Sequence, residues 1–81
     1  MFYVYVLKSG KDNKLYVGST SNLSRRIKEH NEGKVKSTSY RRPIELIYYE
    51  AYREEDIARK REHLLKSGKA HVELKKRLGM E

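Results

Sequence analysis

The first residues alternate in a way that predicts a strand. Segment 2–8 is rich in β-branched and aromatic side chains, which favour a pleated, half-buried surface. The alternation places Tyr3 and Tyr5 on the same face. The polar stretch 9–13 has the composition of a turn, and residues 14–18 read as a short second strand. The two strands are expected to form an antiparallel hairpin.

Helical spacing replaces this alternation after the hairpin. Leu23, Ile27 and His30 recur on one helical face until Gly33, and the Ser and Asn residues before Leu23 are possible N-caps. We therefore predict a helix over about residues 22–32.

The middle of the chain changes character twice. Residues 34–42 are polar, basic and without a hydrophobic pattern, which is typical of an exposed loop. The apolar run 44–50 has strand length and could fill the middle of a small sheet. We expect its two tyrosines Tyr48 and Tyr49, together with Tyr52, to serve packing alone.

Two further helices are expected at the end. Acidic residues at 54–56 suit a helix start, a stripe of Ile and Leu follows as far as Gly68, and residues 69–78 continue as a last helix. The order is β-β-α-β-α-α. The predicted fold class is α+β, an α/β sandwich with a three-stranded, mainly antiparallel sheet flanked by helices, and residues 1–81 are predicted to form a single domain.

Composition narrows the class of protein. The 81 residues contain no cysteine, which excludes a disulfide framework, a thiolate metal site and a Cys nucleophile. No apolar run approaches the roughly 20 residues of a membrane helix. The apolar start is too short for a signal core and no basic region precedes it. We expect a soluble, cytoplasmic protein.

The charge points to a polyanionic partner. The formal net charge is +8, and it is uneven: residues 1–40 carry 8 basic and 3 acidic groups, whereas residues 41–81 carry 11 and 8. Such a field attracts nucleic acid or an anionic membrane surface. Membrane association is the poorer alternative, because no predicted helix pairs a broad apolar face with a basic one.

Four ordered markers run through the chain. They are Tyr3-Val4-Tyr5, then after ten residues Tyr16-Val17-Gly18, then Arg26 following Leu23, and finally Glu62 within the stretch Ala58–Lys66. With these markers the sequence resembles the GIY-YIG nuclease family, especially its small stand-alone bacterial members, and is related to the nuclease domain of the excision-repair endonuclease. Segments 37–43 and 49–50 also look like those small members.

The resemblance implies a metal-dependent endonuclease that hydrolyses phosphodiester bonds. It implies that Arg26 binds the scissile phosphate and that Glu62 binds one Mg²⁺ or Mn²⁺. It places His30 close to the catalytic centre. It also implies structured or damaged DNA as substrate, in repair or recombination.

The tyrosines have a physical constraint of their own. Tyr is an uncommon base because its ordinary pKa is about 10, so it needs a nearby cation or hydrogen bond that favours the phenolate. Adjacent strands bring Tyr5 and Tyr16 within plausible mutual reach, and Gly18 allows a close backbone approach. Either tyrosine could be the base, and packing in the sheet is the alternative role for both.

The polar helical residues also have plainer explanations. Arg26 lies four residues before His30 on one helical face, and its guanidinium could bind phosphate, snorkel to water or pair with an acid. Glu62 could bind Mg²⁺, which needs few carboxylates, or form an i,i+4 pair with Lys66 worth about 0.3–0.5 kcal/mol. Arg61 falls within the apolar arc of the same helix.

The remaining predicted contacts to nucleic acid give affinity without base readout, because no base-reading motif is present. Any substrate preference is then for the shape of the nucleic acid, or comes from a protein partner. We expect DNA rather than RNA as the ligand, and a monomer or weak dimer. A non-catalytic basic binding module is the alternative function, and a solubilising surface is the alternative role of the charge. The predicted contact residues are Tyr3, Gly18, Arg25, Lys28, Lys34, Lys36, Arg41 and Arg42.

Overall fold

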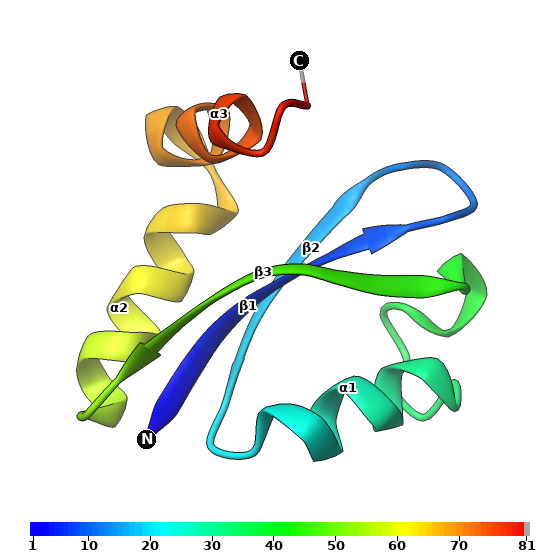
Figure 1. The fold of residues 1–81 in the computed structure, drawn as a ribbon, viewed down its shortest axis with the longest axis horizontal. Coiled ribbons are helices and arrows are strands. Elements are labelled where there is room, and N and C mark those ends of the chain that lie inside the picture. Colours follow the sequence, from blue (N-terminus) through cyan, green and yellow to red (C-terminus); the bar gives the residue numbers. More distant parts are fainter. Residues whose placement is uncertain (81) are drawn as a thin grey trace.

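Three strands and three α-helices form the fold in the computed structural model, which describes residues 1–80 (Figure 1). The α+β class and the order β-β-α-β-α-α are confirmed. The elements are β1 (Phe2–Ser9), β2 (Leu15–Thr20), α1 (Leu23–Asn31), β3 (Ile44–Tyr52), α2 (Glu55–Lys66) and α3 (Gly68–Arg77).

The sheet is antiparallel throughout and its strand order is β2-β1-β3. The expectation that the run at 44–50 fills the middle of the sheet is therefore wrong, because β3 is an edge strand. The central strand is β1, in which Val4, Tyr5, Val6 and Leu7 are all buried. A strand covered on both faces and both edges buries its side chains, so a polar group such as the Tyr5 hydroxyl needs a hydrogen-bond partner.

The two faces of the sheet pack against different helices. Val4 and Val6 face the core formed with α2 and α3, whereas Tyr5 and Leu7 face α1, whose Leu23 packs beside them. This division confirms the alternation predicted for the first strand. In Figure 1, α1 lies to one side of the strands, while α2 and α3 lie to the other.

Helix α1 begins and ends where its sequence signals predict. The Asn22 side chain accepts a hydrogen bond of 3.1 Å from the backbone N–H of Arg25. At the other end Gly33 has φ +77°, a conformation that glycine adopts without strain. Both signals fix the length of α1 and hence the side chains that it holds over the sheet.

The segment after α1 differs from the exposed loop that was expected. A short 3₁₀ helix spans Ser39–Arg41, and the side chains of Val35 and Thr38 are buried. Thr38 is drawn inward by a hydrogen bond to the ring of His30. A pattern of hydrophobic residues could not reveal this, because the buried contact is polar.

Within residues 1–80, the helices are too short and too polar to cross a membrane.

Candidate active site at the end of the hairpin

Tyr5 is the buried centre of the polar site. It lies on the central strand with 1% of its surface exposed. Its hydroxyl is 3.0 Å from Nε2 of His30, which is itself fully buried on α1. The two rings meet edge to face, with centroids 5.6 Å apart. The helix and the sheet are thus joined by a polar contact inside the apolar layer between them.

A chain of hydrogen bonds fixes the tautomer of His30. The Thr38 hydroxyl donates to the backbone oxygen of Val35 at 3.5 Å, so its oxygen accepts from Nδ1 of His30 at 2.7 Å. Burial, with a smaller contribution from Arg26, lowers the pKa of His30, and the neutral ring has one donor and one acceptor. Nε2 is therefore the acceptor, and the Tyr5 hydroxyl donates to it.

Gly18 on β2 has no side chain and so leaves room for the hydroxyl of Tyr5. It is the register partner of Tyr5, and a Cβ atom at position 18 would overlap the hydroxyl and lie 2.6 Å from Cζ. Tyr16, two residues earlier on the same strand, has its ring centroid 6.4 Å from that of Tyr5 in a tilted arrangement and 5.2 Å from that of His30, edge to face. The structure therefore brings Tyr5, Tyr16, Gly18 and His30 together.

Arg26 supplies the positive charge of this group. Its Nη1 donates to Oε1 of Glu29 at 3.1 Å, and 38% of the side chain is exposed. A hydrogen-bonding interaction with Tyr5 raises the pKa of Arg26 further. Burial raises the pKa of Tyr5, Arg26 acts against that rise, and Tyr16 and Glu62 add to it. Tyr5 therefore keeps its proton in this environment.

A pocket of about 280 Å³ opens beside Arg26. Its wall combines hydroxyl and amide side chains with two guanidinium groups and one carboxylate. They come from the end of β2 and the start of α1: Ser19, Thr20, Ser21, Asn22, Arg25, Arg26 and Glu29. Such a lining suits an anion that accepts several hydrogen bonds.

Glu62 reaches the same strand end from the other face of the sheet. Ser19 donates from Oγ to Oε1 at 2.6 Å, and Nζ of Lys66 lies 2.8 Å from Oε2. Burial would raise the pKa of Glu62, but the hydrogen bonds from Lys66 and Ser19 outweigh it and lower the pKa. The pair with Lys66 that was considered as an alternative is thus present, and Glu62 is ionised beside Ser19.

The donor set around Glu62 bears on a metal ion. Residues 1–80 contain no cluster of three or more His, Cys, Asp or Glu side chains suited to a metal ion. One ionised carboxylate with the Ser19 hydroxyl beside it still fits Mg²⁺, which keeps most of its waters and takes other ligands from phosphate. The Lys66 ammonium would share that carboxylate with the ion.

Comparison with known proteins decides the family. The family model described as the GIY-YIG catalytic domain matches residues 1–78. The chain belongs to the GIY-YIG family. A UPF0213 protein of Staphylococcus haemolyticus is 43% identical over 74 residues, which is 90% of this chain and 89% of that protein. A UPF0213 protein of the archaeon Natronomonas pharaonis is 46% identical over 66 residues, 80% of this chain and 76% of that protein.

A solved structure agrees with the fold of this GIY-YIG domain. The solution NMR structure of a UPF0213 protein from Bacillus halodurans superposes with a TM-score of 0.55 at 35% sequence identity. The match covers 91% of this chain and 81% of that one. The resemblance stated from the four sequence markers is confirmed.

The basic residues predicted to bind nucleic acid surround α1 of this GIY-YIG domain. Arg25, Lys28, Lys34, Lys36 and Arg42 are exposed, although Arg25 pairs with Glu29 at 3.4 Å and Lys34 with Glu32 at 3.1 Å. Arg42 donates from Nε to the backbone oxygen of Ser39. Arg41 lies over the ring of Tyr40. Tyr3 is half-buried, and Gly18 is buried against Tyr5.

Two polar partners of the site are absent from the sequence predictions. Ser19 and Thr38 each hold a functional side chain, Glu62 and His30 respectively. Thr38 lies in a segment without a hydrophobic pattern, and the likeness of segment 37–43 to the small family members does not indicate its contact with His30. Ser19 directly follows the second tripeptide, and its side chain faces α2, on the opposite side of the sheet from Gly18. The alternation along β2 would have indicated this orientation.

Another polar cluster of this GIY-YIG domain lies on the face covered by α2 and α3. Glu50 accepts hydrogen bonds from Tyr48 and Tyr52 and binds Arg61 through two bonds of 2.9 and 3.0 Å. The expectation that these tyrosines serve packing alone is wrong for Tyr48 and Tyr52. Glu50 also explains why Arg61 lies within the apolar arc of α2.

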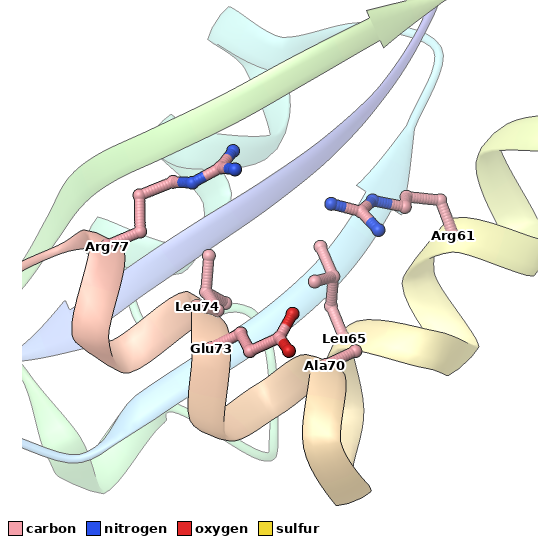
Figure 2. Close-up of a pocket in the computed structure, with 6 residues that line it drawn as sticks. All are labelled: Arg61, Leu65, Ala70, Glu73, Leu74 and Arg77. Carbon is pink, nitrogen blue, oxygen red and sulfur yellow. The ribbon is translucent and has the colours of Figure 1, made fainter.

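The same face carries a small pocket (Figure 2). Its volume is about 80 Å³, and the side chains that line it are Arg61, Leu65, Ala70, Glu73, Leu74 and Arg77. Figure 2 shows Arg61 and Arg77 on opposite sides of it. The pocket lies across the sheet from Tyr5 and His30, so it belongs to the contact between α2 and α3 and not to the site.

Proposed function

We propose that this protein is a metal-dependent endonuclease that hydrolyses phosphodiester bonds in DNA. One observation carries the proposal: Tyr5 and Tyr16 pack together on the α1 face of the hairpin, Arg26 of α1 interacts with Tyr5, and Glu62 accepts a hydrogen bond from Ser19 of β2 on the other face. Hydrolysis of a phosphodiester needs a base for water, a cation for the phosphate and a stabilised leaving oxygen.

Arg26 and the pocket beside it suit the scissile phosphate. The guanidinium is a fixed fork of donors with 38% of the side chain exposed, and the backbone and hydroxyl groups of 19–22 line the same pocket. Glu29 holds the fork in place through a hydrogen bond of 3.1 Å. A phosphate bound here would contact the guanidinium that interacts with Tyr5.

Tyr5 and Tyr16 differ in burial, and we assign them different roles. Tyr5 is almost inaccessible to solvent, its pKa is raised, and its hydroxyl donates a hydrogen bond to His30. Tyr16 is only half-buried and lies at the outer side of the same ring cluster. We therefore assign the activation of water to Tyr16 and the positioning of the cluster to Tyr5 and His30.

Glu62 and the Ser19 hydroxyl would hold one Mg²⁺ or Mn²⁺. Such an ion supplies stabilisation of the negative charge on the leaving oxygen. We propose structured or damaged DNA as substrate, in repair or recombination, with a protein partner supplying further specificity. The absence of a base-reading motif in the sequence supports selection by shape.

Cleavage of end-labelled DNA tests the assignment of the base. Flap, branched and single-stranded substrates are incubated with Mg²⁺ and with Mn²⁺. Tyr16→Phe is expected to lose at least 100-fold in rate, whereas the matched hydroxyl deletion Tyr40→Phe, at an exposed tyrosine outside the candidate site, keeps the wild-type rate. Equal rates for wild type and Tyr16→Phe would contradict the role of Tyr16.

One observation favours the non-catalytic alternative. The Lys66 ammonium occupies one oxygen of Glu62, and the Ser19 hydroxyl occupies the other. A basic module that only binds nucleic acid would keep that ion pair. Binding that needs no divalent ion and survives Glu62→Gln, together with no cleavage under any condition, would favour this alternative.

A further inference from the structure

Two tyrosines form an exposed pair on the sheet. The rings of Tyr3 on β1 and Tyr49 on β3 meet edge to face, with centroids 6.1 Å apart and an interplanar angle of 62°. Tyr49 is 53% exposed and Tyr3 is half-buried. Both belong to the face of the sheet that carries α1, and α1 leaves them uncovered.

This exposed pair adjoins the candidate active site. Tyr49 is the register partner of Tyr5 across the β1–β3 ladder, and Tyr3 lies two residues before Tyr5 on the same face. Side chains of directly opposed residues begin about 4.5–5.5 Å apart. Tyr5 in turn interacts with the guanidinium of Arg26. A row of rings therefore runs from the phosphate-binding group to the edge of the sheet.

Packing alone does not account for this arrangement. A cross-strand aromatic pair stabilises a sheet, but that role does not require half of the Tyr49 surface to face water. The first tripeptide in the family name is Gly-Ile-Tyr, and this chain has Tyr3-Val4-Tyr5 in its place. The ring of Tyr3 is therefore an addition to that pattern. The half of the chain that supplies Tyr3 carries 8 basic and 3 acidic groups.

We propose that Tyr3 and Tyr49 form a stacking platform for unpaired bases of the DNA strand whose phosphate is bound at Arg26. The second half of this statement rests on the proposed function. Aromatic rings beside a basic groove are the usual means of binding single-stranded nucleic acid, because every base has a face that can stack. The net charge of +8 complements the phosphates of that strand.

The platform gives the site a preference for unpaired DNA. Bases within a duplex stack on one another and cannot leave that stack without a cost in free energy. Unpaired bases in a single strand, a flap or a branch are free to lie on Tyr49. Duplex DNA would bind through its phosphates alone.

Fluorescence anisotropy without divalent ion tests the platform. The probes are a fluorescein-labelled single-stranded 12-mer and the corresponding duplex at one salt concentration. Tyr49→Ala is expected to weaken single-strand binding roughly tenfold and duplex binding less than twofold. Tyr49→Phe, which keeps the ring, is expected to bind both probes within twofold of wild type.

Tyr40→Ala is the matched control, because Tyr40 is also an exposed tyrosine, 64% accessible, in the 3₁₀ helix Ser39–Arg41. It should leave single-strand binding within twofold. An equal loss for Tyr40→Ala and Tyr49→Ala, or an equal loss of Tyr49→Ala on both probes, would overturn the platform. Circular dichroism before each titration identifies any variant that does not fold. In that case Tyr49→Phe is used for a second test, in which a 2-aminopurine base in the single strand is expected to be quenched on binding. Unquenched 2-aminopurine would overturn the proposal.

These results are independent of cleavage. If the protein binds single strands through Tyr49 but cleaves no DNA with any divalent ion, the endonuclease proposal fails and the platform stands. If it cleaves DNA but Tyr49→Ala binds like wild type, the platform fails and the endonuclease proposal stands.

Discussion

The hydroxyl of Tyr5 lies 3.0 Å from Nε2 of His30 at a point where both residues are buried. A buried polar group without a partner is costly, so each of these side chains depends on the other. The first residue comes from the central strand and the second from α1. Their contact fixes the helix, and with it Arg26, over the hairpin.

Loss of one hydroxyl should measure this dependence. Tyr5→Phe leaves Nε2 of His30 as a buried acceptor without a donor, and is expected to lower the free energy of unfolding by about 1–3 kcal/mol. The control Tyr49→Phe removes a hydroxyl from an exposed ring and should change it by less than about 0.5 kcal/mol. Urea denaturation followed by circular dichroism gives both values. Equal losses of unfolding free energy in the two variants would show that the buried hydrogen bond stabilises the fold no more than the exposed hydroxyl does.

A methyl group at position 18 should displace Tyr5. The added Cβ of Gly18→Ala would lie 2.6 Å from Cζ of Tyr5, so the buried ring must move. We expect a loss of about 1–3 kcal/mol in the free energy of unfolding and a shifted NMR signal from the ring of His30. Gly68→Ala is the control, because its methyl meets nothing within 4 Å although its φ is +70°. An unchanged His30 signal in Gly18→Ala would contradict the close packing.

Glu50 should make stability depend on pH in acid. Burial opposes its ionisation, but hydrogen bonds from Arg61, Tyr48 and Tyr52 outweigh burial and lower its pKa from 4.5 to about 2. A lowered pKa in the folded state gives stability that is full above pH 4.5 and is lost as the pH falls through about 2. Since Glu50 is partly exposed, we expect a contribution of about 2 kcal/mol.

Urea denaturation between pH 6 and pH 2 measures that contribution. The Glu50→Gln variant should show a shallower decline than wild type, because it has no carboxyl group to protonate. Glu55→Gln, which removes an exposed carboxylate paired with Arg59, is the control and should follow wild type. Parallel curves for wild type and Glu50→Gln would disprove the role of Glu50.

Removing the ammonium beside Glu62 should favour cation binding. Nζ of Lys66 lies 2.8 Å from Oε2, so it competes for the oxygen that a divalent ion would use. Lys66→Met is expected to bind Mn²⁺ several-fold more tightly by isothermal titration calorimetry. Lys60→Met removes a charge from an exposed position of the same helix and should have a smaller effect. If the two variants bind Mn²⁺ alike, competition at Glu62 is refuted.

Local signals in the sequence were sufficient for most of the fold. The start of α1 follows from Asn22 and its end from Gly33, and the two faces of β1 follow from its alternation. The place of β3 at the edge of the sheet could not be predicted in this way. Strand order depends on which strand is covered on both sides, and an apolar run fits an edge strand as well as a central one when helices cover its face.

The candidate site was predictable through the resemblance to the GIY-YIG family, because the residues alone left packing open as the role of the tyrosines. Tyr5, Tyr16 and Arg26 are residues that the resemblance indicated, and the structure brings them together. Thr38 and Glu50 lie in segments that resemble the small family members, but that resemblance gives them no partner, because each binds a residue that is distant in the sequence. Contacts of this kind depend on tertiary structure, which a residue pattern does not contain.

The most direct test of the central claim is the single-turnover rate of DNA cleavage by wild type and Glu62→Gln, each with and without Mg²⁺. The matched control is Glu73→Gln, which changes an exposed carboxylate on α3 that is not among the residues of the candidate site. We predict that wild type and Glu73→Gln cleave at the same rate and only with Mg²⁺, and that Glu62→Gln is at least 100-fold slower. Cleavage by Glu62→Gln at the wild-type rate, or no cleavage by wild type on any branched, flap or single-stranded substrate, would contradict the account.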